Sequence, residues 1–177
     1  MDYDKSGYFD EKFEELSIDD ICKKLDVDIR DINDISKKTN FTVEAGVFYA
    51  NEERFFILGE KNYINIPTDI NIEKLIHSHP KGTSFSAEDI FVATEIGMSQ
   101  IVAFNDVYFY SIIFDNPVIS KNFIKNKALL VYDELYQKVL RGDIINSQLL
   151  FSINHKLWKQ ISSEIKGFRY EYYKIKK

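Results

Sequence analysis

Short apolar runs with a period of two fill residues 41–114, and this alternation constrains the fold more than any other feature of the chain. In FTVEAGVFYA (41–50), every second residue from Phe41 to Tyr49 is apolar or aromatic, which is typical of a strand with one buried face. A β-sheet is therefore expected at the centre of the fold. Further strands are expected at RFFILG (54–59), YINIP (63–67), EKLIHSH (73–79), QIVAF (100–104) and VYFYSIIF (107–114).

One segment within this series changes to a helical pattern. SAEDIFVATEIG (86–97) is expected to be a short helix, with Ser86 as its N-cap and Gly97 as its stop. Outside the series we expect an acidic helical segment at residues 8–38, helices at 118–141 and 147–166, and a possible last strand at 168–175.

These elements predict an α+β fold, with a mixed β-sheet flanked by helices, in one domain over residues 1–177. The core would span about residues 40–115, between the N-terminal helical segment and C-terminal helices within 118–166. Hydrophobic residues make up 45% of the chain, which is enough for a sizeable core.

Charge and composition exclude several classes of protein. The net charge of −5 argues against a general nucleic-acid surface. The acidic N-terminus lacks the apolar region of a signal peptide, and no apolar run is as long as a membrane span. A cytoplasmic protein without membrane contact is therefore expected. The single cysteine, Cys22, allows no intrachain disulfide.

Two of the three histidines in the chain lie one residue apart in HSHP (77–80). Because side chains alternate along a strand, His77 and His79 should point to the same face, where two imidazoles can share a metal ion. Pro80 favours an extended conformation at His79. The third histidine, His155, lies in the helical pattern of 147–166, where a lone histidine is usually structural or exposed.

An acidic side chain can complete this site from the next element. Asp89 would lie in the first turn of the helix that begins at Ser86, where its carboxylate can return over the strand end. Ser86 and Asp89 also match the S-x-x-[DE] capping pattern, and taken alone they are typical of a helix start. Two histidines and one carboxylate are a typical ligand set for a catalytic zinc, whose fourth position holds water.

A general base is still needed, and Glu44 is the candidate. It is the only acidic residue in FTVEAGVFYA (41–50). A lone carboxylate in an apolar strand is costly unless its face opens on a cleft or a metal ion. Gly46, two residues further on the same face, leaves space beside it.

The combination of an upstream strand glutamate, HSHP and S-x-x-D resembles the JAMM (MPN+, JAB1/MPN/Mov34) metalloprotease family. The six-residue turn PKGTSF (80–85) is one residue shorter than the common spacing, and HPxGTSFS resembles a bacterial or phage-associated branch. The resemblance implies a cytidine-deaminase-like fold and one zinc ion. It also implies the site residues: His77, His79 and Asp89 as zinc ligands, Glu44 as acid/base, and Ser86, with Ser84 as the alternative, as oxyanion donor.

The resemblance implies a zinc metallopeptidase that hydrolyses a peptide or isopeptide bond, with the C-terminal tail of a ubiquitin-like protein as an expected substrate. Two alternatives remain open at this stage. The same residues could hydrolyse another amide, such as a peptidoglycan cross-link, or the domain could be a non-catalytic binding scaffold. The sequence does not indicate an oligomeric state.

Overall fold

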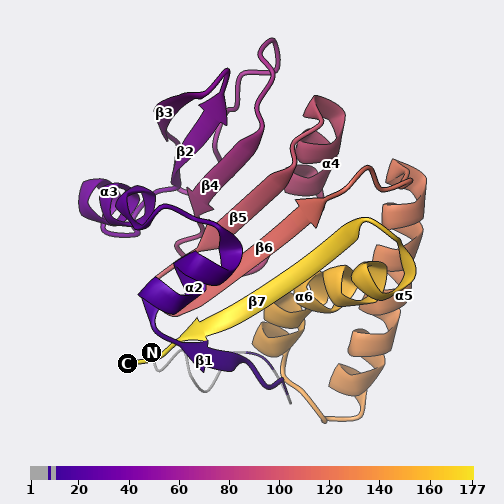
Figure 1. The fold of residues 1–177 in the computed structure, drawn as a ribbon. Helices are drawn as coiled ribbons and strands as arrows, with labels where there is room; N and C mark the ends of the chain where they lie inside the picture. Colours follow the sequence, from indigo (N-terminus) through magenta and orange to yellow (C-terminus); the bar gives the residue numbers. More distant parts are fainter. Residues whose placement is uncertain (1–7, 9–10) are drawn as a thin grey trace.

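A seven-stranded mixed sheet forms the centre of the protein (Figure 1). The structure is a computed structural model that describes residue 8 and residues 11–177. The strand order is β1-β7-β6-β5-β4-β2-β3. Only the β1–β7 and β4–β5 pairs are parallel. The strands are β1 (Glu14–Leu16), β2 (Ala45–Ala50), β3 (Glu53–Leu58), β4 (Lys74–Ser78), β5 (Gln100–Phe104), β6 (Tyr108–Phe114) and β7 (Phe168–Ile175).

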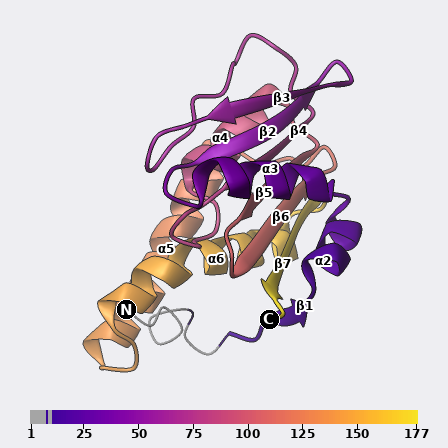
Figure 2. The same ribbon diagram turned by 90° about the vertical axis from the view of Figure 1, so that its left-hand side faces the viewer.

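Helices cover both faces of this sheet, and the described residues contain five of them. The helices are α2 (Ile18–Leu25), α3 (Ile29–Thr39), α4 (Ala87–Ile96), α5 (Lys121–Leu140) and α6 (Asn146–Glu164). Figure 2 shows α2 and α3 on one side of the sheet and α5 and α6 on the other. This arrangement confirms the predicted α+β class with a mixed sheet and C-terminal helices.

Two hydrophobic cores follow from the alternation of side chains along the strands. Val47 and Ile76 pack toward α2 and α3, whereas Phe48 and Leu75 pack toward α4, α5 and α6. The central strands are therefore buried on both faces, as expected where helices cover a sheet twice. His77 follows Leu75 by two residues, so it belongs to the α4 side of the sheet.

Local sequence signals predicted several elements correctly. Ser86 is the N-cap of α4, and Gly97 ends the helix in a left-handed conformation with φ of 81°. Asn105 forms the turn between β5 and β6, because its side-chain oxygen accepts hydrogen bonds from the backbone N–H groups of Val107 and Tyr108. The C-terminal strand also forms, but it lies inside the sheet between β1 and β6.

The N-terminal segment differs from the single helical segment expected at residues 8–38. Its described part forms β1 and then two helices, α2 and α3, while residues 9 and 10 lie outside the described residues. The helical pattern is interrupted at Asp26, which adopts a left-handed conformation with φ of 54° and caps α2. β1 has three residues, too few to show a period, and it forms by parallel pairing with β7.

Two strand predictions were wrong in part or in full. β2 begins at Ala45 and not at Phe41, because Phe41 has a φ of 56°, which no strand allows. YINIP (63–67) is not a strand but part of an irregular segment between β3 and β4. A turn that joins the Glu60 N–H to the Tyr63 carbonyl opens this segment, and Pro67 has no N–H for a ladder.

Candidate metal centre

The end of β4 places His77 and His79 on one face of the sheet, as the alternation predicted. The backbone N–H of His79 donates to the Phe104 carbonyl at 2.8 Å, which extends the pairing with β5 beyond Ser78. Both imidazoles are buried, and their Nε2 atoms lie 2.8 Å apart. Ser78 points the opposite way, where its hydroxyl accepts a hydrogen bond from the Ala45 N–H.

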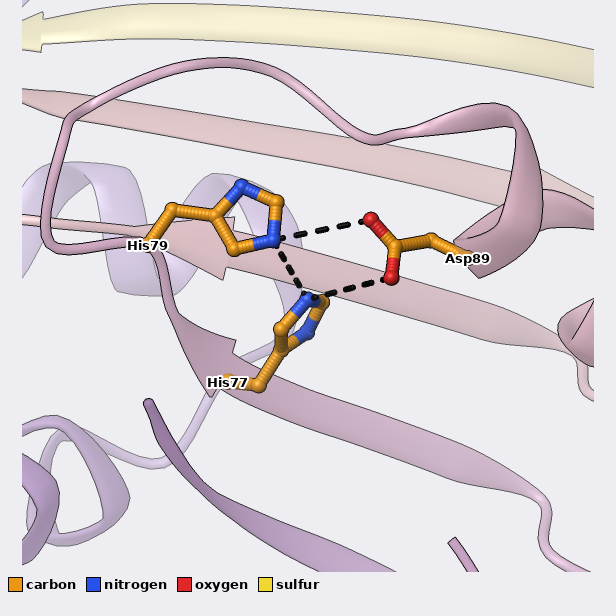
Figure 3. A group of neighbouring side chains, drawn as sticks. All are labelled: His77, His79 and Asp89. Carbon is orange, nitrogen blue, oxygen red and sulfur yellow. Dashed lines mark hydrogen bonds and ion pairs between the residues drawn. The ribbon is translucent and has the colours of Figure 1, made fainter. Parts of the chain in front are cut away.

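Asp89 approaches the two histidines from the first turn of α4 (Figure 3). Its Oδ1 lies 4.0 Å from His77 Nε2, and its Oδ2 lies 3.5 Å from His79 Nε2. The carboxylate is also half of a capping box. Its Oδ2 accepts from the Ser86 N–H at 2.8 Å, while Ser86 Oγ accepts from the Asp89 N–H at 3.2 Å. One hydrogen-bond pattern therefore starts the helix and aims the carboxylate.

The three side chains form a buried group that could hold a metal ion, since each offers one ligand atom and these atoms lie within 4.8 Å of one another. Two imidazole lone pairs at 2.8 Å repel unless a proton or a cation lies between them. Burial lowers the pKa of His77 from 6.5 to about 3, with the nearby His79 as a second cause, so this imidazole is neutral near pH 7. Two imidazoles beside a carboxylate fit zinc and similar divalent metals.

The other ring nitrogen of His79 is already engaged. His79 Nδ1 lies 2.8 Å from the Thr83 carbonyl oxygen, which can only accept a hydrogen bond. The proton is therefore on Nδ1, and the lone pair of Nε2 faces Asp89 and His77. Such outer contacts orient histidine ligands in metal sites. Sequence reasoning did not identify this role of Thr83, because a carbonyl acceptor can come from any residue.

Glu44 lies directly before β2 and lines the same cleft as His79 and Asp89. Desolvation raises the pKa of its carboxyl from 4.5 to about 7. His79 opposes this shift, and the charge of Asp89 adds to it. A carboxyl group with a pKa near 7 is suited to take up and release a proton at neutral pH.

The two candidate serine hydroxyls are placed differently. Ser86 is exposed at the start of α4 and lines the cleft, and its own hydroxyl proton can turn toward a bound substrate. Ser84 is buried, and its Oγ lies 2.8 Å from Tyr170 Oη. This geometry favours Ser86 as the donor that faces substrate.

The cleft beside these residues has a volume of about 580 Å³. One wall is the segment from Lys61 to Thr68, which includes the YINIP residues that were expected to be a strand. Pro80, Lys81 and the start of α4 also line the cleft. The irregular segment thus forms part of the site, which is common for long loops next to a rigid sheet.

Comparisons with protein-family models, with curated proteins and with solved structures found no match for this chain. What the structure shows of the motif is the buried group of His77, His79 and Asp89, which could bind a metal ion. Among the described residues, no helix is long and apolar enough to cross a membrane.

Proposed function

We propose that this protein is a zinc-dependent metallopeptidase of the JAMM type, which hydrolyses a peptide or isopeptide bond. One observation carries the proposal: Glu44, with its raised pKa, lines the same cleft as His79 and Asp89 of the candidate metal group. A metal-binding group alone fits many roles, but a nearby carboxyl group that can exchange a proton at neutral pH indicates hydrolysis.

In the proposed reaction, His77, His79 and Asp89 hold the metal ion. A bound zinc ion would polarise the scissile carbonyl and make water more acidic. The carboxylate of Glu44 takes a proton from the attacking water, whose oxygen bonds to the carbonyl carbon. The Ser86 hydroxyl donates a hydrogen bond to the oxyanion. Glu44 then delivers the proton to the nitrogen as the C–N bond breaks.

The proposed substrate is a protein, and a C-terminal tail of a ubiquitin-like protein is the first to test. The cleft is open, and its wall between Lys61 and Thr68 is irregular, so an extended segment of another chain can enter it. A peptidoglycan amide would use the same catalytic residues, so a panel of substrates must separate the two.

Metal content is the first test of this function. Protein purified without a His-tag or chelators should contain about one zinc per chain by elemental analysis. The double variant His77→Ala/Asp89→Ala should contain none. A folded wild-type protein that takes up no metal would contradict the enzyme function and favour a scaffold.

Activity should then depend on Glu44. Glu44→Gln should keep the metal and lose at least about a hundredfold in rate on ubiquitin-like fusions, as is typical for loss of a general base. Glu60→Gln is a matched control, because Glu60 is exposed and its backbone carbonyl accepts from the Glu44 N–H. Full activity in Glu44→Gln would remove Glu44 from the mechanism.

A further inference from the structure

Side chains of β6, α6 and β7 hold the turn that joins the histidines to α4. Tyr110 of β6 donates its hydroxyl to the Gly82 carbonyl at 2.7 Å. Trp158 of α6 donates its indole N–H to the Phe85 carbonyl at 2.8 Å. Between these contacts, Ser84 Oγ lies 2.8 Å from Tyr170 Oη of β7. The turn therefore has three buried anchors within four residues.

Thr83 lies between two of these anchors, and its carbonyl is the acceptor for His79 Nδ1. Its neighbours Gly82 and Ser84 are both tied to tyrosine hydroxyls. A shift of either neighbour would move the Thr83 carbonyl and so rotate the His79 ring. The direction of Nε2 toward Asp89 thus depends on contacts that lie behind the metal ligands.

The anchor at Ser84 continues further into the protein. Tyr170 Oη also lies 2.8 Å from His155 Nδ1, and His155 is fully buried. On its other side, His155 Nε2 lies 3.6 Å from Glu11 Oε2, and Lys159 binds both oxygens of that carboxylate. Since Glu11 can act only as an acceptor when ionised, the proton of a neutral His155 is best placed on Nε2.

This placement gives the whole chain of contacts one direction. With its proton on Nε2, His155 accepts from the Tyr170 hydroxyl at Nδ1. Tyr170 Oη is then free to accept from the Ser84 hydroxyl. Ser84 thus donates to Tyr170 and Tyr170 donates to His155. His155 turns its Nε2 proton toward Glu11 Oε2 at 3.6 Å, which is longer than a hydrogen bond. Two buried hydrogen bonds that run in one direction, from Ser84 through Tyr170 to His155, favour one arrangement of the groups they join.

We infer that Ser84, Tyr170 and His155 are positioning residues of the metal centre, which hold the turn so that the Thr83 carbonyl aims His79 at the metal. This inference rests on the metal site proposed above. It gives α6 and β7 a role in the site although neither contributes a ligand. His155 acts through two other residues and does not reach the metal.

Tyr170→Phe tests the inference, because it removes one hydroxyl and keeps the ring. We expect zinc affinity, measured by competition with a chromophoric chelator, to fall by about tenfold to a hundredfold. The visible spectrum of the Co²⁺-substituted protein should change as the geometry at His79 relaxes. Tyr172→Phe is the matched control, since Tyr172 lies on the same strand and contacts the His155 ring.

A double variant distinguishes the loss of the Ser84–Tyr170–His155 contacts from general damage to the fold. Ser84→Ala breaks the same chain as Tyr170→Phe, so the two together should lower zinc affinity no further than either alone. Additive losses of zinc affinity would show that Ser84 and Tyr170 do not act through one shared series of contacts. Wild-type affinity and an unchanged Co²⁺ spectrum in Tyr170→Phe would overturn the inference and leave the metal site intact. A wild-type protein that binds no zinc would instead refute the proposed function.

Discussion

Gly46 of β2 lies directly opposite His77 of β4 in the antiparallel ladder, and the backbones approach closely at this pair. A Cβ atom at Gly46 would lie 2.9 Å from the Ile76 carbonyl oxygen and 3.2 Å from His77 Cβ. The missing side chain at Gly46 therefore leaves room for the buried His77, a candidate metal ligand, in the neighbouring strand. From the sequence, the absence of a side chain at Gly46 was expected to leave space for Glu44, whereas in the structure it leaves space for His77.

Gly46→Ala should consequently disturb the metal centre through His77. The obstructing atom is backbone, so the strands must separate slightly, at a cost of about 1–3 kcal/mol in the free energy of unfolding. Zinc affinity should fall as well. Gly97→Ala is the control, because φ of 81° strains alanine there while its Cβ would meet no atom within 4 Å. It should lower stability and leave zinc affinity unchanged; equal zinc affinity in both variants would contradict a role of Gly46 in the site.

The two functions of the Ser86–Asp89 pair can be separated by mutation. Ser86→Ala removes the cap hydroxyl and should cost about 1 kcal/mol in the free energy of unfolding, while the zinc ligands remain. Asp89→Asn keeps an oxygen that can accept from the Ser86 N–H, so it should nearly preserve stability of the metal-free protein. It replaces an anionic ligand with a neutral one and should lose most of the zinc.

Urea unfolding of the metal-free variants and elemental analysis of the purified ones would check this pair. Ser86→Ala should lower mainly the free energy of unfolding, whereas Asp89→Asn should lower mainly the zinc content. If Asp89→Asn retained a full equivalent of zinc, the carboxylate would be a helix cap and nothing more.

Much of the site followed from local sequence, because local rules determine it. Strand alternation placed His77 and His79 on one face, and the capping pattern placed Asp89 in the first turn of α4. The anchors of the turn could not be predicted in this way. Ser84 and Tyr170 are 86 positions apart in sequence, and only the pairing of β7 with β6 brings them together.

Other features of the fold that the sequence did not predict have a similar origin. His155 was expected to be structural or exposed, and it is buried and structural, but nothing near it in sequence indicates that Tyr170 and Glu11 converge on it. YINIP has the composition of a strand, but it does not add to the edge strand β3: the Glu60 N–H bonds to the Tyr63 carbonyl, and Pro67 has no N–H for a ladder. Composition reports the preference of a segment, whereas pairing depends on its tertiary context.

Metal binding should stabilise the fold by mass action. A ligand at a hundred times its dissociation constant adds about 2.7 kcal/mol to the free energy of unfolding, which corresponds to roughly 5–10 °C in Tm for a chain of this size. Thermal unfolding with and without zinc, followed by addition of EDTA, would measure it. The His77→Ala/Asp89→Ala variant should show no such shift. A similar shift in that variant would indicate zinc binding elsewhere.

The raised pKa of Glu44 makes a prediction about pH that needs no substrate. Its carboxyl has a pKa of about 7 in the folded metal-free protein and 4.5 when unperturbed. Between these values the folded protein binds more protons than the unfolded chain, so this group's contribution to stability falls as the pH rises. The contribution is fully present below pH 4.5 and is lost as the pH rises through 7. Because Glu44 is only partly buried, the loss should be on the order of 1–2 kcal/mol.

Glu44→Gln isolates this contribution from those of His77 and His155, whose pKa values are lowered by burial and act in the opposite direction. Urea unfolding of metal-free wild type and variant at pH 5 and pH 8 gives four free energies. The variant should gain relative to wild type at pH 8, because glutamine never carries the charge that desolvation opposes at this position. Parallel pH dependence in the two proteins would mean that Glu44 titrates as an ordinary exposed carboxyl, and its assignment as the proton carrier would lose its physical basis.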